Sequence, residues 1–325
     1  MRRRALFKLA AAAAAAAPDT SFAQGFPSRA VSLVVPYPAG GPTDTLTRIM
    51  GEAMQRPLGQ SVLVENITGA SGAIGVTKVA RANPDGYTLS IGHASSHITI
   101  WATQPAGGFE LLRDMTPVLL WAVNPSFLSA RRGLEPTTLK ELIAWLKANP
   151  GKASMGGAFG TLGHIASLEL KQRIGAEFQF VPYRGGAPAM QDLISGQIDL
   201  LVDQAANSLP QLRGGKIKAY AVMARERLKV APEIPTVDEA GLPGFYVTTW
   251  HGMWAPRGTP DAVVERLNAA AREALATEKV KQRFDDLGQE IPPPEMQTVA
   301  ALAAFQRAEV ERWTPLLKAA NLKTE

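Results

Sequence analysis

The chain has 325 residues, no cysteine and a formal net charge of +5 at pH 7. The absence of cysteine excludes disulfides, thiol catalysis and cysteine-ligated metals, so a hydrophobic core must hold the fold, and this length predicts two domains. Most of the positive charge lies within the first eight residues and no basic block follows residue 24, so nucleic acid is not expected as a partner.

The first 23 residues are typical of an export signal. Three arginines at positions 2–4 precede an Ala-rich apolar stretch that is too short to span a bilayer. Small residues then follow at Ser21-Phe22-Ala23, which predicts cleavage near Ala23. A basic start is common to Sec and twin-arginine signals, so both export routes stay open. The rest of the chain is expected to be free and soluble in the periplasm.

Apolar runs alternate with helical patterns along the remaining chain. Thr138 and Glu141 form a capping box that opens a helix ending before Asn149, and Thr259 is expected to cap a helix that begins at Pro260. Alternation of this kind predicts an α/β fold with mainly parallel sheets. The predicted strands are 31–35, 61–65, 87–91, 116–123, 153–155, 178–181, 198–202 and 217–223.

A glycine turn follows the first predicted strand and precedes a helical pattern. Such a turn can direct several free N–H groups at one point, where the helix dipole favours negative charge, so residues 36–44 predict an anion site that suits a carboxylate. Gly41 is expected to need a backbone angle that other residues avoid. The alternative is an ordinary turn capped by Thr43 or Asp44. The candidate ligand residues are Tyr37, Ala39, Gly40, Gly41, Pro42, Thr43 and Asp44.

Three further donor-rich strand ends occur in the second half of the chain. They follow the predicted strands at 153–155, 178–181 and 198–202. Ligands of open α/β sheets collect at the carboxyl ends of strands, so turns from two halves predict a cleft between two lobes. Neither a dinucleotide G-x-G-x-x-G nor a P-loop motif is present. The candidate ligand residues here are Gly157, Thr161, His164, Tyr183, Gly185 and Asp203.

Three of the candidate side chains allow more than one interpretation. Asp203 either ends a strand as a cap or selects ligands that carry an ammonium group, because a carboxylate in the cleft repels a second one. Trp101 either packs in the core or forms an aromatic wall of the cleft. His93 and His97 are four residues apart but lack a third metal ligand, so no metal or cofactor is expected, and His97 is predicted to donate to a carboxylate.

In order and spacing, these segments resemble the Bug (TctC-like) family of periplasmic solute-binding proteins, which serve tripartite tricarboxylate transporters. The resemblance covers the whole chain after the signal, although the stretch after His97 lacks the Asn-Pro pair common in the family. The segments that carry it are VPYPAGGPTD (35–44), VENITGASGAIG (64–75), ANPDGYTL (82–89), GGAFGTLGH (156–164), VPYRGGAPAM (181–190), GQIDLLVD (196–203) and IPTVDEAGLPG (234–244) followed by Trp250-His251-Gly252.

The resemblance implies an α/β, two-lobed clamshell of the type II-like periplasmic binding protein class. Each lobe is expected to be a mainly parallel sheet flanked by helices, with 25–124 plus 246–325 as lobe 1 and 125–245 as lobe 2. It also implies a monomer that binds a dicarboxylate, tricarboxylate, aromatic acid or amino acid through backbone N–H groups. The partners would be membrane transporter subunits.

Two other functions use the same features differently. A sensor subunit that presents its ligand to a membrane histidine kinase would have the same fold and cleft. A periplasmic hydrolase is the enzyme alternative, but the chain has no G-x-S-x-G motif and its four histidines lack evident serine and aspartate partners. The sequence therefore predicts a binding protein rather than an enzyme.

Overall fold

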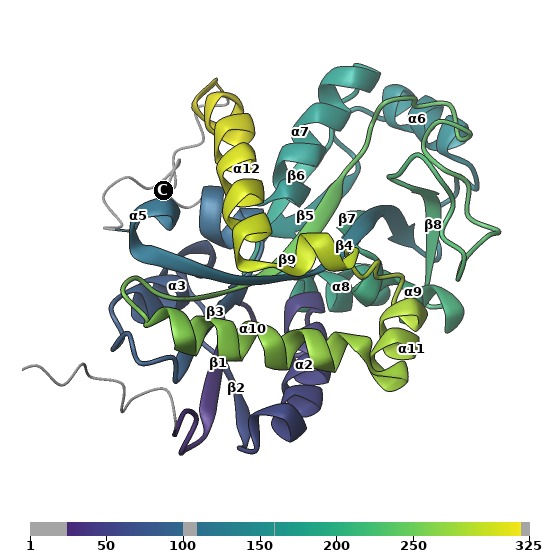
Figure 1. Cartoon of the computed structure of the whole chain (residues 1–325). Helices are drawn as coiled ribbons and strands as arrows, with labels where there is room; N and C mark the ends of the chain where they lie inside the picture. The colour runs from purple at the N-terminus through teal and green to yellow at the C-terminus, as the bar shows by residue number, and fades with distance from the viewer. Residues whose placement is uncertain (1–24, 100–108, 159, 320–325) are drawn as a thin grey trace, which may run out of the picture.

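The computed structural model describes residues 25–99, 109–158 and 160–319 (Figure 1). The predicted signal peptide with its cleavage near Ala23 and the residue Trp101 lie outside this part of the chain. Among the helices within it, none combines the length and the apolar character needed to cross a membrane.

The described strands form one curled sheet. Its order is β2-β1-β3-β9-β4-β7-β5-β6, and β8 pairs with β4. Helices flank the sheet (Figure 1), so the predicted α/β class is confirmed. The strands are β1 (Val31–Val35), β2 (Val62–Asn66), β3 (Thr88–Gly92), β4 (Met115–Arg131), β5 (Ser154–Ala158), β6 (Gln179–Tyr183), β7 (Leu200–Gln204), β8 (Ile217–Val222) and β9 (Thr248–Pro256).

The helices connect the strands and cover both faces of the sheet. Their bounds are α2 (Pro42–Leu58), α3 (Ala73–Ala80), α5 (Leu111–Asp114), α6 (Leu139–Ala148), α7 (Leu162–Ile174), α8 (Gly186–Ser195), α9 (Ala205–Arg213), α10 (Asp261–Ala276), α11 (Glu278–Asp286) and α12 (Val299–Ala319). Short turns of other helix types are η1 (Ala70–Gly72), η2 (Ser95–Thr99) and η4 (Pro294–Gln297).

The sheet has two parts that share β4. Strands β1, β2 and β3 pair in parallel at one end, and β5, β6 and β7 pair in parallel at the other. We call the first part, with α2, α3 and α10–α12, lobe 1, and the second, with α6–α9 and β8, lobe 2. Both lobes are mixed rather than mainly parallel, because β4 runs antiparallel to β9 and to β7 and β8.

Strand β4 passes from one lobe into the other. It pairs with β9 as far as Pro125, opposite Thr248, and with β7 from Ser126 onward. The predicted strand at 116–123 is therefore only the first half of a strand of 17 residues. The sequence pattern missed the second half because Asn124-Pro125 interrupts the apolar run.

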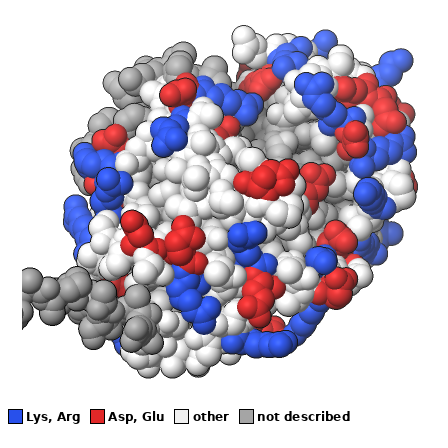
Figure 2. Space-filling view, in the orientation of Figure 1, with Lys and Arg blue, Asp and Glu red and all other residues white. Residues whose placement is uncertain are grey.

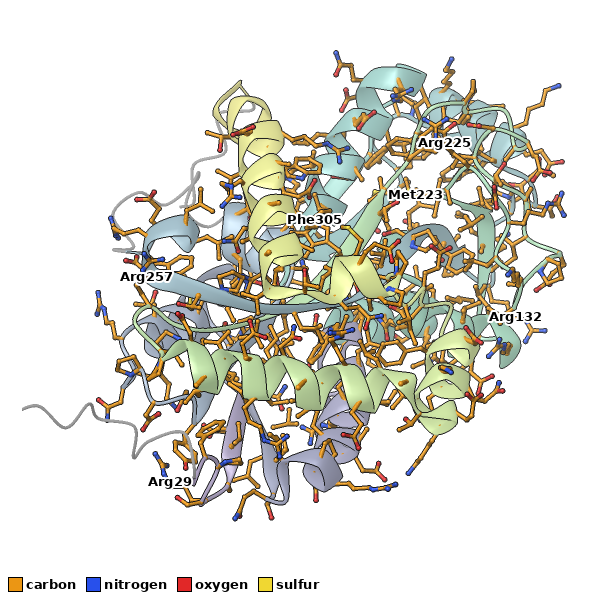
Figure 3. The ribbon with its side chains drawn as sticks, viewed as in Figure 1. Arg29, Arg132, Met223, Arg225, Arg257 and Phe305 are labelled. Atoms are coloured by element: carbon orange, nitrogen blue, oxygen red, sulfur yellow. The ribbon has the colours of Figure 1, made fainter. Side chains whose placement is uncertain are left out.

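Each lobe has its own apolar core. One core packs β1 and β3 against α2 and α10, and the other packs β5 and β7 against α6 and α7. Helix α12, which carries Phe305 (Figure 3), returns to β9, where the Trp250 ring meets the Phe305 ring with centroids 5.1 Å apart. The buried Trp250 also donates its indole N–H to Glu309 at 2.7 Å. The C-terminal helix is thereby fixed to lobe 1.

The helix starts agree with the sequence prediction at one place and differ at two. The capping box of Thr138 and Glu141 is confirmed. The cap of α10 is Pro260 rather than Thr259, whose hydroxyl donates to the Pro256 carbonyl instead. The cap of α2 is Gly41, so Thr43 and Asp44 lie inside the first helical turn. The interpretation of Thr43 or Asp44 as the cap was wrong.

Candidate functional site

A small cavity lies where the two lobes meet. Its volume is about 70 Å³, and residues of both lobes line it. The predicted residues that reach it are Tyr37, Gly41, Pro42, Thr43, Gly157, Thr161, Gly185 and Asp203. Lining residues that the sequence analysis did not identify include His93, Ser95, Ser126, Leu162, Gly186, Gln204 and Thr249.

The N-termini of four helices meet at this cavity. Gly41 and Thr161 cap α2 and α7, Gly185 caps α8, and Gln204 caps α9, and all four residues line the cavity. None of the four caps uses a side chain to satisfy the first-turn N–H groups. Free N–H groups and aligned helix dipoles favour a negative charge at such a point. Among the described lining residues there is no lysine or arginine, so the attraction comes from the backbone.

The loop of residues 36–44, here called the first loop, turns at Gly40. Gly40 has a φ of +79°, which a residue with a side chain rarely adopts. Gly41 has a φ of −78°, so the expectation that Gly41 needs an unusual backbone angle was wrong. A Cβ at Gly41 would lie 3.4 Å from the Pro38 carbonyl and 3.8 Å from Ala187 of the other lobe. Space between the lobes, not backbone strain, limits this position.

Asp44 holds the first loop in shape but does not line the cavity. Its carboxylate accepts hydrogen bonds from the Gly40 N–H at 2.8 Å, from Arg48 at 3.0 Å and from the Asn66 amide at 2.9 Å. Burial raises the pKa of Asp44, but these hydrogen bonds outweigh it and hold the pKa below the usual value. Ala39, Gly40 and Asp44 were predicted as ligand residues, and the structure places them on the outer side of the loop.

A group of uncharged aromatic rings packs against the first loop. Tyr37 stacks on His93 with ring centroids 5.1 Å apart, and His93 meets His251 edge-on at 5.4 Å. The Thr43 hydroxyl lies 3.2 Å from Nε2 of His251. Burial lowers the pKa of His93 to about 3 and that of His251 well below its usual value. Both histidines are therefore neutral at pH 7 and add no positive charge to the cavity.

His97 lies in the core of lobe 1 and not at the cavity. Its side chain is fully buried, stacks on Trp254 at 4.1 Å and lies within hydrogen-bond distance of the hydroxyls of Ser90 and Ser96. The chain around it forms η2, a π-helical turn, so the spacing from His93 does not place the two rings on one face. The described residues contain no group of three metal-binding side chains.

Two predicted residues of lobe 2 lie beside the cavity without lining it. His164 accepts a hydrogen bond from the Gly160 N–H at 3.2 Å and stacks on Phe180, and burial lowers its pKa. Tyr183 donates its hydroxyl to Asp192 at 2.6 Å, and burial is the main reason that its pKa rises to about 12. Both side chains have structural partners of their own.

Asp203 is the only charged side chain among the described residues that line the cavity. It is 8% exposed, and its carboxylate accepts hydrogen bonds from the Gln204 N–H at 2.8 Å and from Asn207. A Cβ on Gly186 would approach this carboxylate to 3.0 Å, so the glycine leaves it room. Burial raises the pKa of Asp203 to about 6, because no cation offsets the loss of water. The cavity therefore carries one carboxylate that is readily protonated.

The lobes contact one another around the cavity. The Leu162 N–H of lobe 2 donates to the Ser95 hydroxyl of lobe 1 at 3.2 Å. A Cβ added to Gly185 would lie 2.9 Å from the Pro38 ring, so the Gly185 backbone of lobe 2 packs closely against this ring of lobe 1. The amide oxygen of Gln204, which also lines the cavity, has no hydrogen-bond partner among the described residues. It is available to a bound molecule.

The connecting strands present opposite faces to two different spaces. Ser126 and Thr249 line the cavity, whereas their neighbours Pro125 and Thr248 line a groove of about 760 Å³ on the other face. Successive residues of a strand point to opposite sides, which explains the division. The sequence analysis missed Ser126 and Thr249 because it predicted no strand through either position.

Comparison with known proteins gives a consistent family. Residues 46–322 match the family model TctC, described as the tripartite tricarboxylate transporter family receptor. The UPF0065 protein of the TAR-I ttuE-ttuC' intergenic region of Agrobacterium vitis is 39% identical over 297 residues, which cover 91% of this chain and 86% of that protein.

Solved structures of similar proteins have the same fold. MatC of Rhodopseudomonas palustris with bound malate is 40% identical, with a TM-score of 0.85 over 90% of this chain and 100% of that one. The periplasmic binding protein BugD is 39% identical, with a TM-score of 0.87 over 92% and 100%. Rpa4515 of R. palustris with adipate is 32% identical, with a TM-score of 0.86 over 92% and 99%.

Proposed function

The chain belongs to the tripartite tricarboxylate transporter receptor family, and from that premise we propose that it captures a small carboxylate between its lobes and delivers it to a membrane transporter. The observation that carries the proposal is the meeting of four helix N-termini at one cavity that no lysine or arginine of the described chain lines. Backbone N–H groups of this kind bind a carboxylate without a cationic side chain.

The known relatives narrow the ligand class. MatC holds malate and Rpa4515 holds adipate, both of which are aliphatic dicarboxylates. We therefore expect an aliphatic dicarboxylate to bind in the cavity between the lobes. We expect one ligand carboxylate to lie at the starts of α2 and α8, where Thr43 and Gly186 line the cavity.

Asp203 is proposed to contact the other end of the ligand. A buried carboxylate without a cation repels a second carboxylate and accepts a hydrogen bond from an ammonium, a hydroxyl or a protonated acid. Asp203 also makes contacts that a helix-start residue would make, through Gln204 and Asn207. The two roles differ in their effect on ligand choice, because only a selecting carboxylate acts differently on an ammonium and on a second carboxylate.

The lobe boundaries predicted from the sequence are part of the proposal. Residues 25–124 with 246–325 would move as one body and 125–245 as the other, with the crossings near 123–126, where β4 changes its strand partner, and near 246–249, at the start of β9. X-ray scattering with and without a saturating ligand should show compaction on binding. An unchanged radius of gyration for the saturated protein would contradict a clamshell motion.

Export, transport partner and oligomeric state complete the proposal. The family match is to a receptor of a transporter, which favours transport over presentation to a sensor kinase. The protein is proposed to act in the periplasm after cleavage near Ala23, as a monomer and without catalysis. Mass spectrometry of the exported protein would give the mature N-terminus.

A thermal-shift screen against carboxylic acids tests the proposed function. A ligand that binds only the folded state at a hundredfold excess over Kd adds about 2.7 kcal/mol to the free energy of unfolding, so a true ligand raises Tm clearly. Calorimetry of each hit should give one site per chain, and the recovered ligand should be chemically unchanged. Turnover of the ligand would support the hydrolase, and a panel without any hit would contradict the carboxylate class.

A further inference from the structure

A second space lies on the outer side of the first loop, away from the cavity. It is a groove of about 910 Å³ between α2 and α11, here called the basic groove. Its floor is apolar, formed by Ile49, Ala53 and Val280. Its charged lining residues are Asp44, Arg48, Glu52, Arg56, Lys279 and Arg283.

The basic groove carries more positive than negative side chains. Four cations face two carboxylates, and both carboxylates are already paired, Asp44 with Arg48 at 2.9 Å and Glu52 with Lys279 at 2.6 Å. Arg56 and Arg283 are exposed and form no hydrogen bond or salt bridge with the rest of the described chain, although the charge of Arg283 also acts on Glu52. Two unpaired cations beside an apolar floor are complementary to a segment that carries both acidic and apolar side chains.

The first loop connects the basic groove to the cavity. Gly41, Pro42 and Thr43 line the cavity, whereas Ala39, Gly40 and Asp44 line the groove. The link between the two sides is the Asp44 carboxylate, which accepts the Gly40 N–H at 2.8 Å and the Arg48 guanidinium at 3.0 Å. A second carboxylate in the groove would compete with Asp44 for Arg48, which lines the groove and whose side chain is 52% exposed.

We propose that the basic groove docks an acidic, partly apolar segment of a protein partner, and that docking alters solute affinity through Arg48, Asp44 and the first loop. The proposal rests on the proposed function in that the partner is the membrane component that receives the solute. The apolar floor favours a peptide segment over a small anion, because a free phosphate or tricarboxylate gains nothing from Ile49 and Val280. Linkage requires the effect to be reciprocal, so bound solute alters partner affinity by the same factor.

The test uses a synthetic peptide of alternating glutamate and leucine, with a lysine–leucine peptide as its control. Calorimetry with the full mature protein should show salt-sensitive binding of the acidic peptide alone. Arg56→Glu with Arg283→Glu should weaken that binding at least about tenfold, as expected for loss of two charge contacts, and leave solute affinity unchanged. The matched control is Arg225→Glu with Arg257→Glu, two exposed arginines that lie at the upper right and at the left of the molecule in Figure 3, away from α11, and it should leave peptide binding intact.

The coupling has its own readout. Saturating acidic peptide should change the solute Kd of the unmodified protein about fivefold or more, within the usual range for linked sites. Arg48→Met should remove this change while peptide binding persists through Arg56 and Arg283.

Three results would overturn the proposal. They are no peptide binding to the unmodified protein, equal binding to the charge-reversed variant, or citrate and phosphate binding at the same residues as tightly as the peptide. Solute titrations of the same preparations test the proposed function separately. If the unmodified protein bound no solute, that function would be contradicted, whereas peptide docking in the basic groove would not.

Discussion

Two aspartates, one in each lobe, lie near the cavity in opposite surroundings, Asp44 in the first turn of α2 and Asp203 near the end of β7. Asp44 of lobe 1 faces away from the cavity and is neutralised by Arg48 at 2.9 Å. Asp203 of lobe 2 lines the cavity and has no cation beside it among the described residues. Hydrogen bonds outweigh burial and lower the pKa of Asp44, whereas burial raises the pKa of Asp203 to about 6.

The difference between the two aspartates suggests that the lobes have different roles in ligand binding. Lobe 1 supplies a loop whose shape is fixed on its outer side, where Asp44 accepts from the Gly40 N–H and from Arg48, so the free N–H groups at the start of α2 are available to any carboxylate. Lobe 2 supplies N–H groups together with one buried carboxylate that penalises some ligands. We infer that lobe 1 recognises the carboxylate common to all ligands and that lobe 2 selects among them.

The charge distribution on the outer surface is less sharply divided. Figure 2 shows Lys and Arg interspersed with Asp and Glu over the face that carries α10, α11 and α12. Exposed pairs such as Lys279 with Glu52 add little stability each. The contrast between the two aspartates therefore comes from burial and partners, and not from the overall charge of the surface.

The largest effect is expected from breaking the contact between the two lobes. Gly185 has extended backbone, with φ of 168°, but a Cβ would lie 2.9 Å from Pro38 across the cavity. Gly185→Val should hold the lobes apart and weaken all ligands about a hundredfold, because overpacking costs about 1–3 kcal/mol and the closing contacts are lost as well. Calorimetric titration measures the affinity.

The fold should survive this change, because the clash is between the lobes and not within one. Gly133→Val is a matched control, since a Cβ there would meet only the flexible end of Arg131. Equal affinity of Gly185→Val and the unmodified protein would remove the close approach of the lobes from the binding mechanism.

The second effect separates the two roles of Asp203. If Asp203 selects ligands, Asp203→Asn should weaken an amino acid ligand and leave or improve a dicarboxylate. The expected difference is about 1–3 kcal/mol, the range for a hydrogen bond to a charged group, or about five- to 150-fold in Kd. Titration of both proteins with aspartate and succinate would decide, and a small uniform change for both ligands would contradict selection and indicate a cap.

The matching change in lobe 1 should act uniformly. Asp44→Asn removes the charge that pairs with Arg48 and weakens the hold on the Gly40 N–H. We expect all ligands to lose about three- to tenfold in affinity, with a loss of about 1 kcal/mol in the free energy of unfolding. Urea unfolding and the same two ligands give the measurements. A ligand-specific effect as large as that of Asp203→Asn would contradict the division between the lobes.

The smallest effect concerns pH and stability. The folded pKa of Asp203, about 6, lies above the unfolded value of 3.8, so between these values the folded protein keeps a proton that the unfolded chain has lost. Stability from this residue therefore falls as pH rises through that window and stays low above it. Relative to the unmodified protein, Asp203→Asn should gain a few degrees in Tm at pH 8 and little at pH 4. A difference that does not change with pH would contradict the raised pKa.

The sequence predicted the fold and the position of the loops better than the direction of single side chains. Strands such as β1 and β3 carry strong apolar runs, and the turns after β1 and β6 place the first loop and Gly185 at the cavity. The prediction that His97 contacts the ligand was wrong. The chain around His97 forms a π-helical turn, and its ring stacks on Trp254 in the core.

The structural role of Asp44 could have been predicted from the sequence. Arg48 lies four residues after it in the same helix, a spacing that favours an ion pair and hence a structural role. The isolation of Asp203 could not be foreseen, because it depends on which residues of other elements surround it. The places of His93, Ser126 and Thr249 in the cavity lining could not be foreseen either, because tertiary packing alone brings them there.

A structure of the protein with the best carboxylate from the thermal-shift screen tests the central claim most directly. The account predicts one carboxylate group against the backbone N–H groups at the starts of α2 and α8, near Thr43 and Gly186, with the rest of the ligand directed toward Asp203. A ligand held by side-chain cations, or bound in one of the outer grooves with the cavity empty, would contradict it.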